Sequence, residues 1–336
     1  MKSLSAALLI AVCAPLAAAP PPSKISTARL SEITRTLASD EFQGRSMGTA
    51  GEERTVNYLI GEFKAAGLEP GGENGGWTQT VPMIRTRLGS SRFSVRQGPT
   101  ETTLRFPDDI YLSTVRAVDH ASIANAPMVF VGYGVAAPER GWDDFKGADL
   151  KGKVAVFLVN DPDFEAAAGE PVAGKFGGQA MTYYGRWTYK FEEAARRGAI
   201  GALIVHDNAG AGYGWNVVQS PAGENFNIVL PAGAQQPVLL QGWIQQPVAE
   251  AMLKRAGYDL AALTAQARTE DFRPVDLHAT FSADAAVDVT RLTSRNVIGK
   301  LTGSAYPTET VSYGGHWDAY GIGPADAQGR RPRRVR

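Results

Sequence analysis

The apolar residues of this chain change their spacing along its length, and each spacing predicts a different kind of element. Between residues 25 and 63 they recur every three or four positions, which is typical of amphipathic helices. One helix is expected over about residues 26–38, and a second after the glycine-rich loop 40–51, with its end at Gly67. The positions that carry this spacing are Ile25, Leu30, Ile33 and Leu37, then Val56, Leu59, Ile60 and Phe63.

Two strand patterns follow. From residue 77 to 112 short alternating runs are broken by glycine and proline, which predicts strands and hairpins at a sheet edge. Beyond about residue 125 the apolar runs become nearly continuous, which is the pattern of strands buried on both faces. These runs are 129–135, 154–159 and 199–205, and helices are expected at 186–197 and 247–256.

This succession predicts an α/β protein in which about 125–260 form a compact unit of their own. With 336 residues and 44% hydrophobic content, the length favours two domains. Lys plus Arg and Asp plus Glu both number 34, so no overall charge favours nucleic acid or a membrane surface. The sequence carries no indication of oligomeric state.

The first 19 residues have the parts of a secretory signal: Lys2, an apolar run from Ala6 to Ala14, and Ala17-Ala-Ala19. The run is too short to span a bilayer. We therefore expect export to the periplasm or the extracellular space, without stable membrane insertion after cleavage. Cys13 lies inside this segment and is the one cysteine, so the mature chain is expected to fold without disulfides.

Candidate chemistry lies near the end of the chain. A β-prone segment, Glu309 to Tyr313, runs into two glycines and then presents His316 and Asp318. In α/β proteins ligands gather beyond the carboxyl ends of strands, and an imidazole there can offer a nitrogen lone pair to Zn²⁺. Asp318 can hold the other ring nitrogen or orient a neighbouring ligand. The competing interpretation is a pair of polar surface residues, which is what most isolated His-x-Asp pairs are.

Two motifs that lie far apart in the sequence favour a metal site over a pair of polar surface residues. Asn296-Val-Ile-Gly-Lys-Leu-Thr-Gly303 followed by Gly315-His-Trp-Asp318 resembles the active-site entry of the co-catalytic di-zinc aminopeptidases, the family of bacterial leucyl aminopeptidases and carboxypeptidase-like glutamate hydrolases. The loop Asp40-Glu-Phe-Gln-Gly-Arg-Ser-Met-Gly-Thr-Ala-Gly51 resembles the N-terminal module of the same family. The resemblance implies two Zn²⁺, with His316 as a zinc ligand and Asp318 as a catalytic-site residue beside it. We interpret Arg45 as a side chain that orders its loop.

Two further stretches, beginning at Gly141 and Gly185, resemble the protease-associated domain that such secreted enzymes carry as an insertion. The implied fold is an incomplete doubly wound zinc-exopeptidase sheet with an inserted, β-rich α/β protease-associated domain that shields the cleft. The implied division is a signal peptide at 1–19, peptidase domain at 20–124, the inserted domain at 125–270, and resumed peptidase domain at 271–336.

The other histidines are weaker candidates. His206 precedes Asp207 after a strand, and we interpret it as a polar loop residue. His278 is expected on the solvated side of a strand and His120 in a loop. A set of aromatic residues either lines a peptide-binding wall or packs inside the compact unit: Tyr183, Tyr184, Trp187, Tyr189, Tyr213 and Trp215.

The resemblance also implies ligands that do not follow His316. The family places a bridging Asp, a Glu-Glu pair, another acidic ligand and a final His after this point, whereas here no Glu and no His follows, and Asp326 has no matching context. Each zinc needs three or more protein ligands. We therefore expect a copy interrupted after its first ligand motif, without measurable turnover and without two retained zinc ions.

The sequence thus predicts a secreted zinc-dependent aminopeptidase, acting on peptides through a zinc-bridged hydroxide in the complete family enzyme. Two alternatives stay open. One is a non-catalytic binding or receptor-like protein on the same fold. The other is a carboxypeptidase or cyclase of the same scaffold. A serine hydrolase is disfavoured because no Gly-x-Ser-x-Gly elbow occurs.

Overall fold

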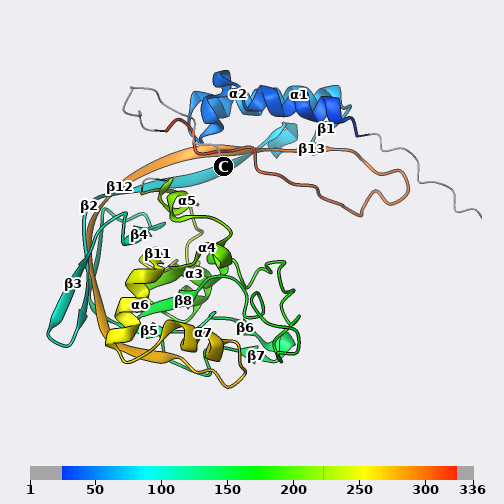
Figure 1. The fold of residues 1–336 in the computed structure, drawn as a ribbon. Coiled ribbons are helices and arrows are strands. Elements are labelled where there is room, and N and C mark those ends of the chain that lie inside the picture. Colours follow the sequence, from blue (N-terminus) through cyan, green and yellow to red (C-terminus); the bar gives the residue numbers. More distant parts are fainter. Residues whose placement is uncertain (1–24, 222, 324–336) are drawn as a thin grey trace, which may run out of the picture.

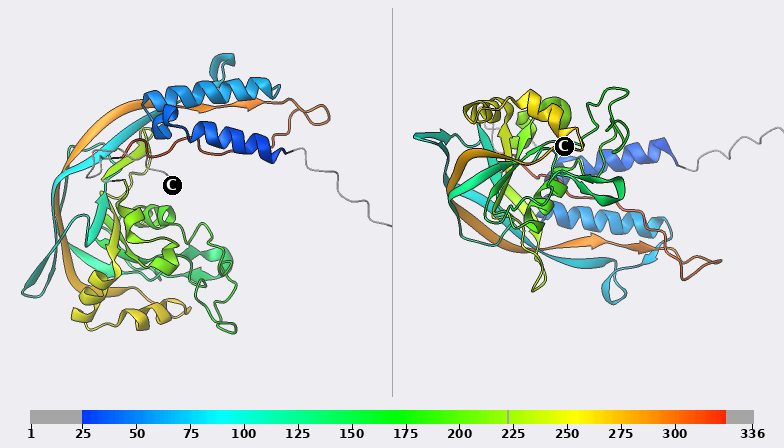
Figure 2. Two further views of the ribbon diagram at one scale, coloured as in Figure 1. Left: turned by 45° about the horizontal axis from the view of Figure 1, so that its top comes forward. Right: turned by 90° about the horizontal axis from the view of Figure 1, so that it is seen from below.

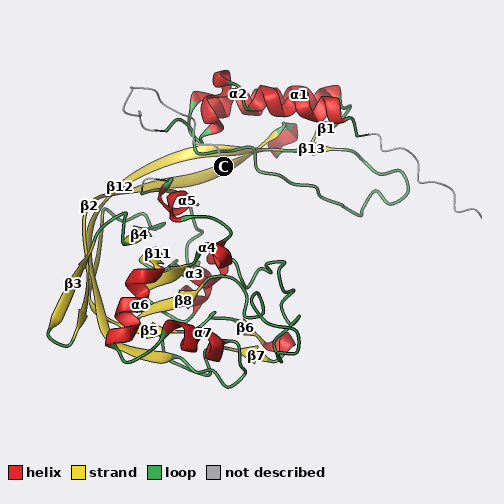
Figure 3. Ribbon diagram, in the orientation of Figure 1, coloured by secondary structure: helices red, strands yellow, loops and turns green. Residues whose placement is uncertain are grey.

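The structure of the protein, a computed structural model, describes residues 25–221 and 223–323. The expected signal segment at 1–19 and Asp326 lie outside the described residues. Helices gather in two places, a pair at one end of the molecule and a group around the central strands (Figure 3). They are α1 (Thr27–Leu37), α2 (Ala50–Ala65), α3 (Trp187–Arg196), α4 (Asn208–Ala211), α5 (Trp215–Gln219), α6 (Gln246–Arg255) and α7 (Leu260–Ala267), with short 3-10 turns at Asp40–Arg45, Glu73–Gly75 and Pro138–Arg140.

The strands range from two residues to more than twenty. They are β1 (Glu69–Pro70), β2 (Thr78–Gln97), β3 (Thr100–Leu104), β4 (Ile110–Ser113), β5 (His120–Phe130), β6 (Ala136–Ala137), β7 (Trp142–Asp143), β8 (Val154–Leu158), β9 (Gly201–His206), β10 (Glu224–Ile228), β11 (Leu240–Gln245), β12 (Val275–Val297) and β13 (Gly299–Lys300).

One large mixed sheet organises the described residues. Its strand order is β10-β2-β12-β5-β8-β9-β11-β4, with β3 beside β2. The run β5-β8-β9-β11 is parallel, and the other neighbours are antiparallel. The chain is therefore a mixed α/β protein. Within the two described ranges, no helix combines the length and the apolar character needed to cross a membrane.

The two longest strands form an arch. β2 and β12 pair from Thr78 opposite Val297 to Arg96 opposite Thr280. Figure 1 shows this curved ribbon running from α1 and α2 at one end to the compact group of strands and helices at the other. Figure 2 shows the same arrangement from two further directions. The sequence predicted hairpins here but not the length of the ribbon.

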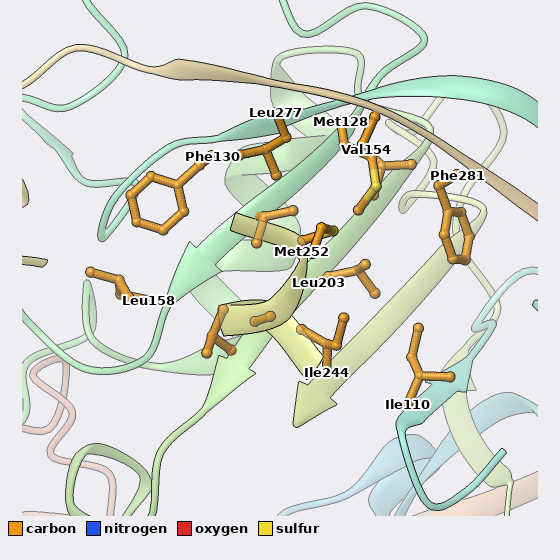
Figure 4. Close-up of a cluster of buried hydrophobic side chains, with 14 of the residues drawn as sticks. Ile110, Met128, Phe130, Val154, Leu158, Leu203, Ile244, Met252, Leu277 and Phe281 are labelled. Carbon is orange, nitrogen blue, oxygen red and sulfur yellow. The ribbon is translucent and has the colours of Figure 1, made fainter. Parts of the chain in front are cut away.

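The parallel strands are buried on both faces, as their continuous apolar runs predict. Alternate residues point to opposite sides, so Val156 and Leu203 belong to one hydrophobic cluster whereas Phe157 and Ile204 belong to the other. Helices α6 and α7 add side chains to the first cluster, among them Met252 of α6 (Figure 4), and α3 covers the second. The helices predicted at 186–197 and 247–256 are thus confirmed as α3 and α6.

Helix α2 begins and ends where its sequence predicts. The Thr49 hydroxyl accepts a hydrogen bond from the Gly51 N–H at 3.2 Å, a common N-terminal cap. At the other end Gly67 has φ 78°, and the Leu68 N–H donates to the Phe63 carbonyl at 3.0 Å. The buried side of this helix includes Val56.

The segment Glu309 to Tyr313 differs from the prediction, because the structure contains no strand there. Val311 is 78% exposed and Tyr313 is 95% exposed. β-prone residues form a strand only when another strand pairs with them. Among the described residues none pairs with this segment, so it has no regular secondary structure.

The division at residue 270 is not visible as a break in the sheet. β12, which begins at Val275, pairs with β5 from within the predicted inserted unit. The two parts of the chain thus share one sheet, and the domain boundaries stay a prediction.

Candidate metal-binding segment

His316 and Asp318 lie close together in an exposed, irregular segment. The Nδ1 atom of His316 is 2.9 Å from the backbone carbonyl oxygen of Asp318 and 3.3 Å from its Oδ1. A carbonyl oxygen only accepts hydrogen bonds, so Nδ1 carries the proton. In the neutral ring the lone pair then resides on Nε2. Because the His316 side chain is 68% exposed, that nitrogen is available to a ligand from solvent.

Residues 316–321, the site segment, are held by the loop that precedes α2. The Ala319 N–H donates to the Arg45 carbonyl at 3.0 Å, and the Gly321 N–H donates to the Gly44 carbonyl at 2.9 Å. The Arg45 Nε–H donates to the Trp317 carbonyl at 2.8 Å. The two motifs that resemble one family are thus in direct contact, although some 270 residues separate them.

Gly44 is required where the two segments meet. Its φ of 66° lies in the left-handed region, and a Cβ there would lie 2.4 Å from the Gly321 carbonyl oxygen. That oxygen belongs to backbone already held by the Gly321 N–H bond to Gly44. Any side chain at position 44 would therefore push the two segments apart.

Arg45 orders its loop, as the sequence predicts. Besides its bond to Trp317, its Nη1–H donates to the Leu37 carbonyl at the end of α1. Its φ of 52° is unusual for a residue with a side chain. The guanidinium thus joins the end of α1 to the site segment.

The arch supplies a second attachment. The Trp317 Nε1–H donates to the Arg295 carbonyl in β12 at 3.0 Å. Arg295 in turn pairs with Glu53 at the start of α2, and this hydrogen bond lowers the pKa of Glu53 below its ordinary value. Nearby, the buried Glu52 accepts from the Ser294 hydroxyl and from the Gly48 N–H. Loop, helix and arch therefore all hold the segment.

The described residues do not complete a metal site. No group of three or more His, Cys, Asp or Glu side chains with suitable placement occurs within 25–221 and 223–323. His316 and Asp318 are two donors, whereas Zn²⁺ in proteins takes three or more. The donor chemistry of His316 fits zinc, but the set found here does not hold the ion alone, so no reaction step through zinc is derived.

The other histidines lie apart from this segment, and two of them differ from the prediction. His206 is not a polar loop residue: it ends β9, is 5% exposed, and its Nε2 has no hydrogen-bond partner. Its ring packs against Trp215 and Trp243. His120 begins β5 rather than lying in a loop, whereas His278 is solvated, as expected.

Sequence reasoning missed a buried polar centre in the compact unit. Lys190 is fully buried and its Nζ donates to three carbonyls, those of Tyr133, Asn160 and Tyr184. Burial lowers the pKa of Lys190 to about 8 and raises the pKa of the buried Asp144 to about 7. Lys190 falls within the helix predicted at 186–197, and a lysine in an amphipathic helix gives no indication in the sequence that its amine is buried.

Part of the aromatic set packs inside the compact unit, which is one of the two roles predicted for it. Tyr189 is buried, and its ring lies 5.0 Å from that of Tyr184, so this part packs within the unit. Tyr183 is 56% exposed and Trp187 is 40% exposed. Those two stay available as a surface.

No family model matches this chain, and no curated protein does. Among solved structures, it is similar to a peptidase M28 precursor from Shewanella amazonensis SB2B, with 17% identity and a TM-score of 0.39 over 87% of this chain and 54% of that one. Two structures of BSAP, a zinc aminopeptidase from Bacillus subtilis, match with 15% identity and a TM-score of 0.30, covering 82% and 80% of this chain and 47% and 45% of theirs. The chain therefore spans about half the length of these proteins.

Proposed function

We propose that this chain belongs to a secreted zinc-dependent exopeptidase that removes N-terminal residues from peptides, with His316 as one zinc ligand. A single observation carries the proposal: Nδ1 of His316 is held by Asp318 while the side chain as a whole is 68% exposed, which leaves Nε2 as the nitrogen that can bind a metal. In a metal-ligating histidine one ring nitrogen donates a hydrogen bond to the protein while the other binds the metal. The remaining zinc ligands come, in this proposal, from outside the described residues.

The wider assignment rests on the arrangement of the chain. In this proposal residues 1–19 direct export, 20–124 and 271–336 belong to a doubly wound peptidase sheet, and 125–270 are an inserted protease-associated domain. Support for the last point is the compact group around β5, β8 and β9, with helices on both faces. Its exposed Tyr183 and Trp187 offer a surface that limits the size of the peptide substrate.

The test compares three exposed histidines in one chain. Diethylpyrocarbonate modifies neutral imidazoles, and mass spectrometry of the peptides reports each site while zinc chloride is added. His316, His120 and His278 all have an aspartate nearby. We expect zinc to protect His316 at a lower concentration than the other two, and Asp318→Asn to weaken that protection. Equal protection of all three would contradict the proposal.

A binding protein without catalysis is the second candidate, because the described residues bring only two donors together. An assay on aminoacyl-anilides, with metal analysis, tests this second candidate. If residues outside the described part complete the site, the chain will release the amine in a chelator-sensitive way. With only these two donors, we expect neither turnover nor two bound zinc ions. Turnover with bound zinc would exclude the binding protein.

A further inference from the structure

We infer that Arg45 is a positioning residue that fixes the direction of the His316 imidazole. It does so through two hydrogen-bonded contacts, or grips, on consecutive peptide units. This inference rests on the proposed role of His316 as a zinc ligand. It assigns to Arg45 a function beyond the order of its own loop.

The first grip is made by the side chain. The Arg45 Nε–H donates to the Trp317 carbonyl at 2.8 Å, which holds the peptide between Trp317 and Asp318. The Nη1–H of the same guanidinium donates to the Leu37 carbonyl. Since the guanidinium is planar, fixing one edge on α1 also fixes the direction in which Nε points. Both of these bonds go to backbone carbonyls.

The second grip is made by the backbone of Arg45. Its carbonyl accepts from the Ala319 N–H at 3.0 Å, which holds the peptide between Asp318 and Ala319. A trans peptide is planar, with its N–H and C=O pointing in opposite directions. Fixing the Ala319 N–H toward Arg45 therefore fixes the Asp318 carbonyl on the other side.

That carbonyl is the one that holds the imidazole. The Asp318 oxygen lies 2.9 Å from His316 Nδ1. A continuous set of contacts thus leads from the Leu37 carbonyl through Arg45 and one peptide plane to the ring. The ring itself is exposed, so packing does not fix its direction. Without Arg45, rotation of the peptide would release Nδ1, and the proton would be free to move to Nε2.

The left-handed φ of Arg45, 52°, allows the two grips to be separated. Glycine adopts this conformation without strain, so Arg45→Gly removes the side-chain grip and leaves the backbone grip possible. Arg45→Lys keeps a charge that can reach one carbonyl but lacks the planar fork. Lys146 provides a matched control, because it is also a basic residue with positive φ whose side chain donates to a carbonyl, and it lies in the compact unit.

The experiment measures two quantities in wild type, Arg45→Gly, Arg45→Lys and Lys146→Gly. Hydrogen exchange of the peptide that contains residues 316–321 reports the grip. Zinc protection of His316 from diethylpyrocarbonate reports the imidazole, with His278 in the same chain as reference. We expect Arg45→Gly to speed the local exchange roughly tenfold, the effect of losing one charge-assisted hydrogen bond. It should also raise, several-fold, the zinc concentration needed to protect His316 from diethylpyrocarbonate.

Arg45→Lys should recover part of both effects, and Lys146→Gly should change neither. Unchanged exchange in Arg45→Gly, or equal acceleration throughout β2 and β12, would overturn the inference. Faster local exchange with an unchanged zinc concentration at His316 would overturn it too. A wild-type protein in which zinc protects no histidine selectively would instead refute the proposed function, and the exchange data would still report whether Arg45 holds the segment.

Discussion

At the scale of single residues, contacts between distant parts of the sequence decide the candidate site. The sequence identified His316 and Asp318 by their spacing and Arg45 by its loop. It did not show that the loop and the site segment touch, because local spacing carries no information about contacts over some 270 residues. The buried state of His206 was missed for the same reason, since the rings that cover it come from α5 and β11.

Replacement of Gly44 by alanine tests the junction. A Cβ would meet the Gly321 oxygen at 2.4 Å, whereas at Gly147, which also has positive φ, it would meet nothing within 4 Å. Gly147→Ala therefore measures backbone strain alone, about 1 kcal/mol or somewhat more. We expect Gly44→Ala to lower the unfolding free energy by a larger amount and to speed exchange at 316–321. Equal effects of the two changes in urea unfolding would contradict the contact.

His206 predicts a pH dependence. Burial lowers its pKa in the folded protein, so the folded state keeps it neutral while the unfolded chain takes up a proton below about pH 6.5. The unfolding free energy should thus decrease as the pH falls from about 6.5 toward the folded pKa. The groups facing the ring are Asp207, whose charge favours protonation, and Tyr213.

The measurement is urea unfolding at pH 7.5 and pH 5.5 for wild type, His206→Gln and, as a control, His278→Gln. The loss of unfolding free energy on acidification should be smaller in His206→Gln than in the other two. The same loss in all three proteins would show that His206 does not remain neutral in the folded state.

At the scale of elements, the sequence predicted those whose pattern is local. The parallel strands, α3, α6 and the ends of α2 follow from apolar runs and caps. The arch did not, because short alternating runs broken by glycine and proline read as separate strands, whereas pairing with β12 carries β2 through Pro82, opposite Thr293, and past a register shift between Ala285 and Val287. The opposite failure occurs at Glu309 to Tyr313, where β-prone residues lack a partner among the described residues.

Lys190 tests how α3 is attached to the loops that follow β5 and β8. Lys190→Met keeps the length of the side chain but removes three hydrogen bonds to carbonyls that lie in the compact unit. We expect the unfolding free energy to fall by about 2–5 kcal/mol, as for other buried polar groups that lose their partner. Exposed Lys151→Met serves as the control. A loss below 1 kcal/mol in denaturant unfolding would mean that other donors replace the amine.

At the scale of the whole molecule, the arch of β2 and β12 connects the helices α1 and α2 to the compact group of strands and helices. The sequence predicted an α/β chain, and the mixed sheet agrees with that coarse description, whereas the compact unit within it stays a prediction. What it could not predict is that β12 joins the unit and the N-terminal helices in one continuous strand. The site segment lies where that strand, α2 and the 44–45 loop come together.

The central claim is that His316 presents Nε2 to a zinc ion. Long-range ¹H–¹⁵N NMR of the imidazoles tests it directly, because the chain contains four histidines and the spectrum reports the tautomer of each. The account predicts that His316 carries its proton on Nδ1 without metal, and that zinc shifts its Nε2 resonance before those of His120 and His278. An Nε2–H tautomer, or an Nε2 resonance that zinc leaves in place, would contradict it.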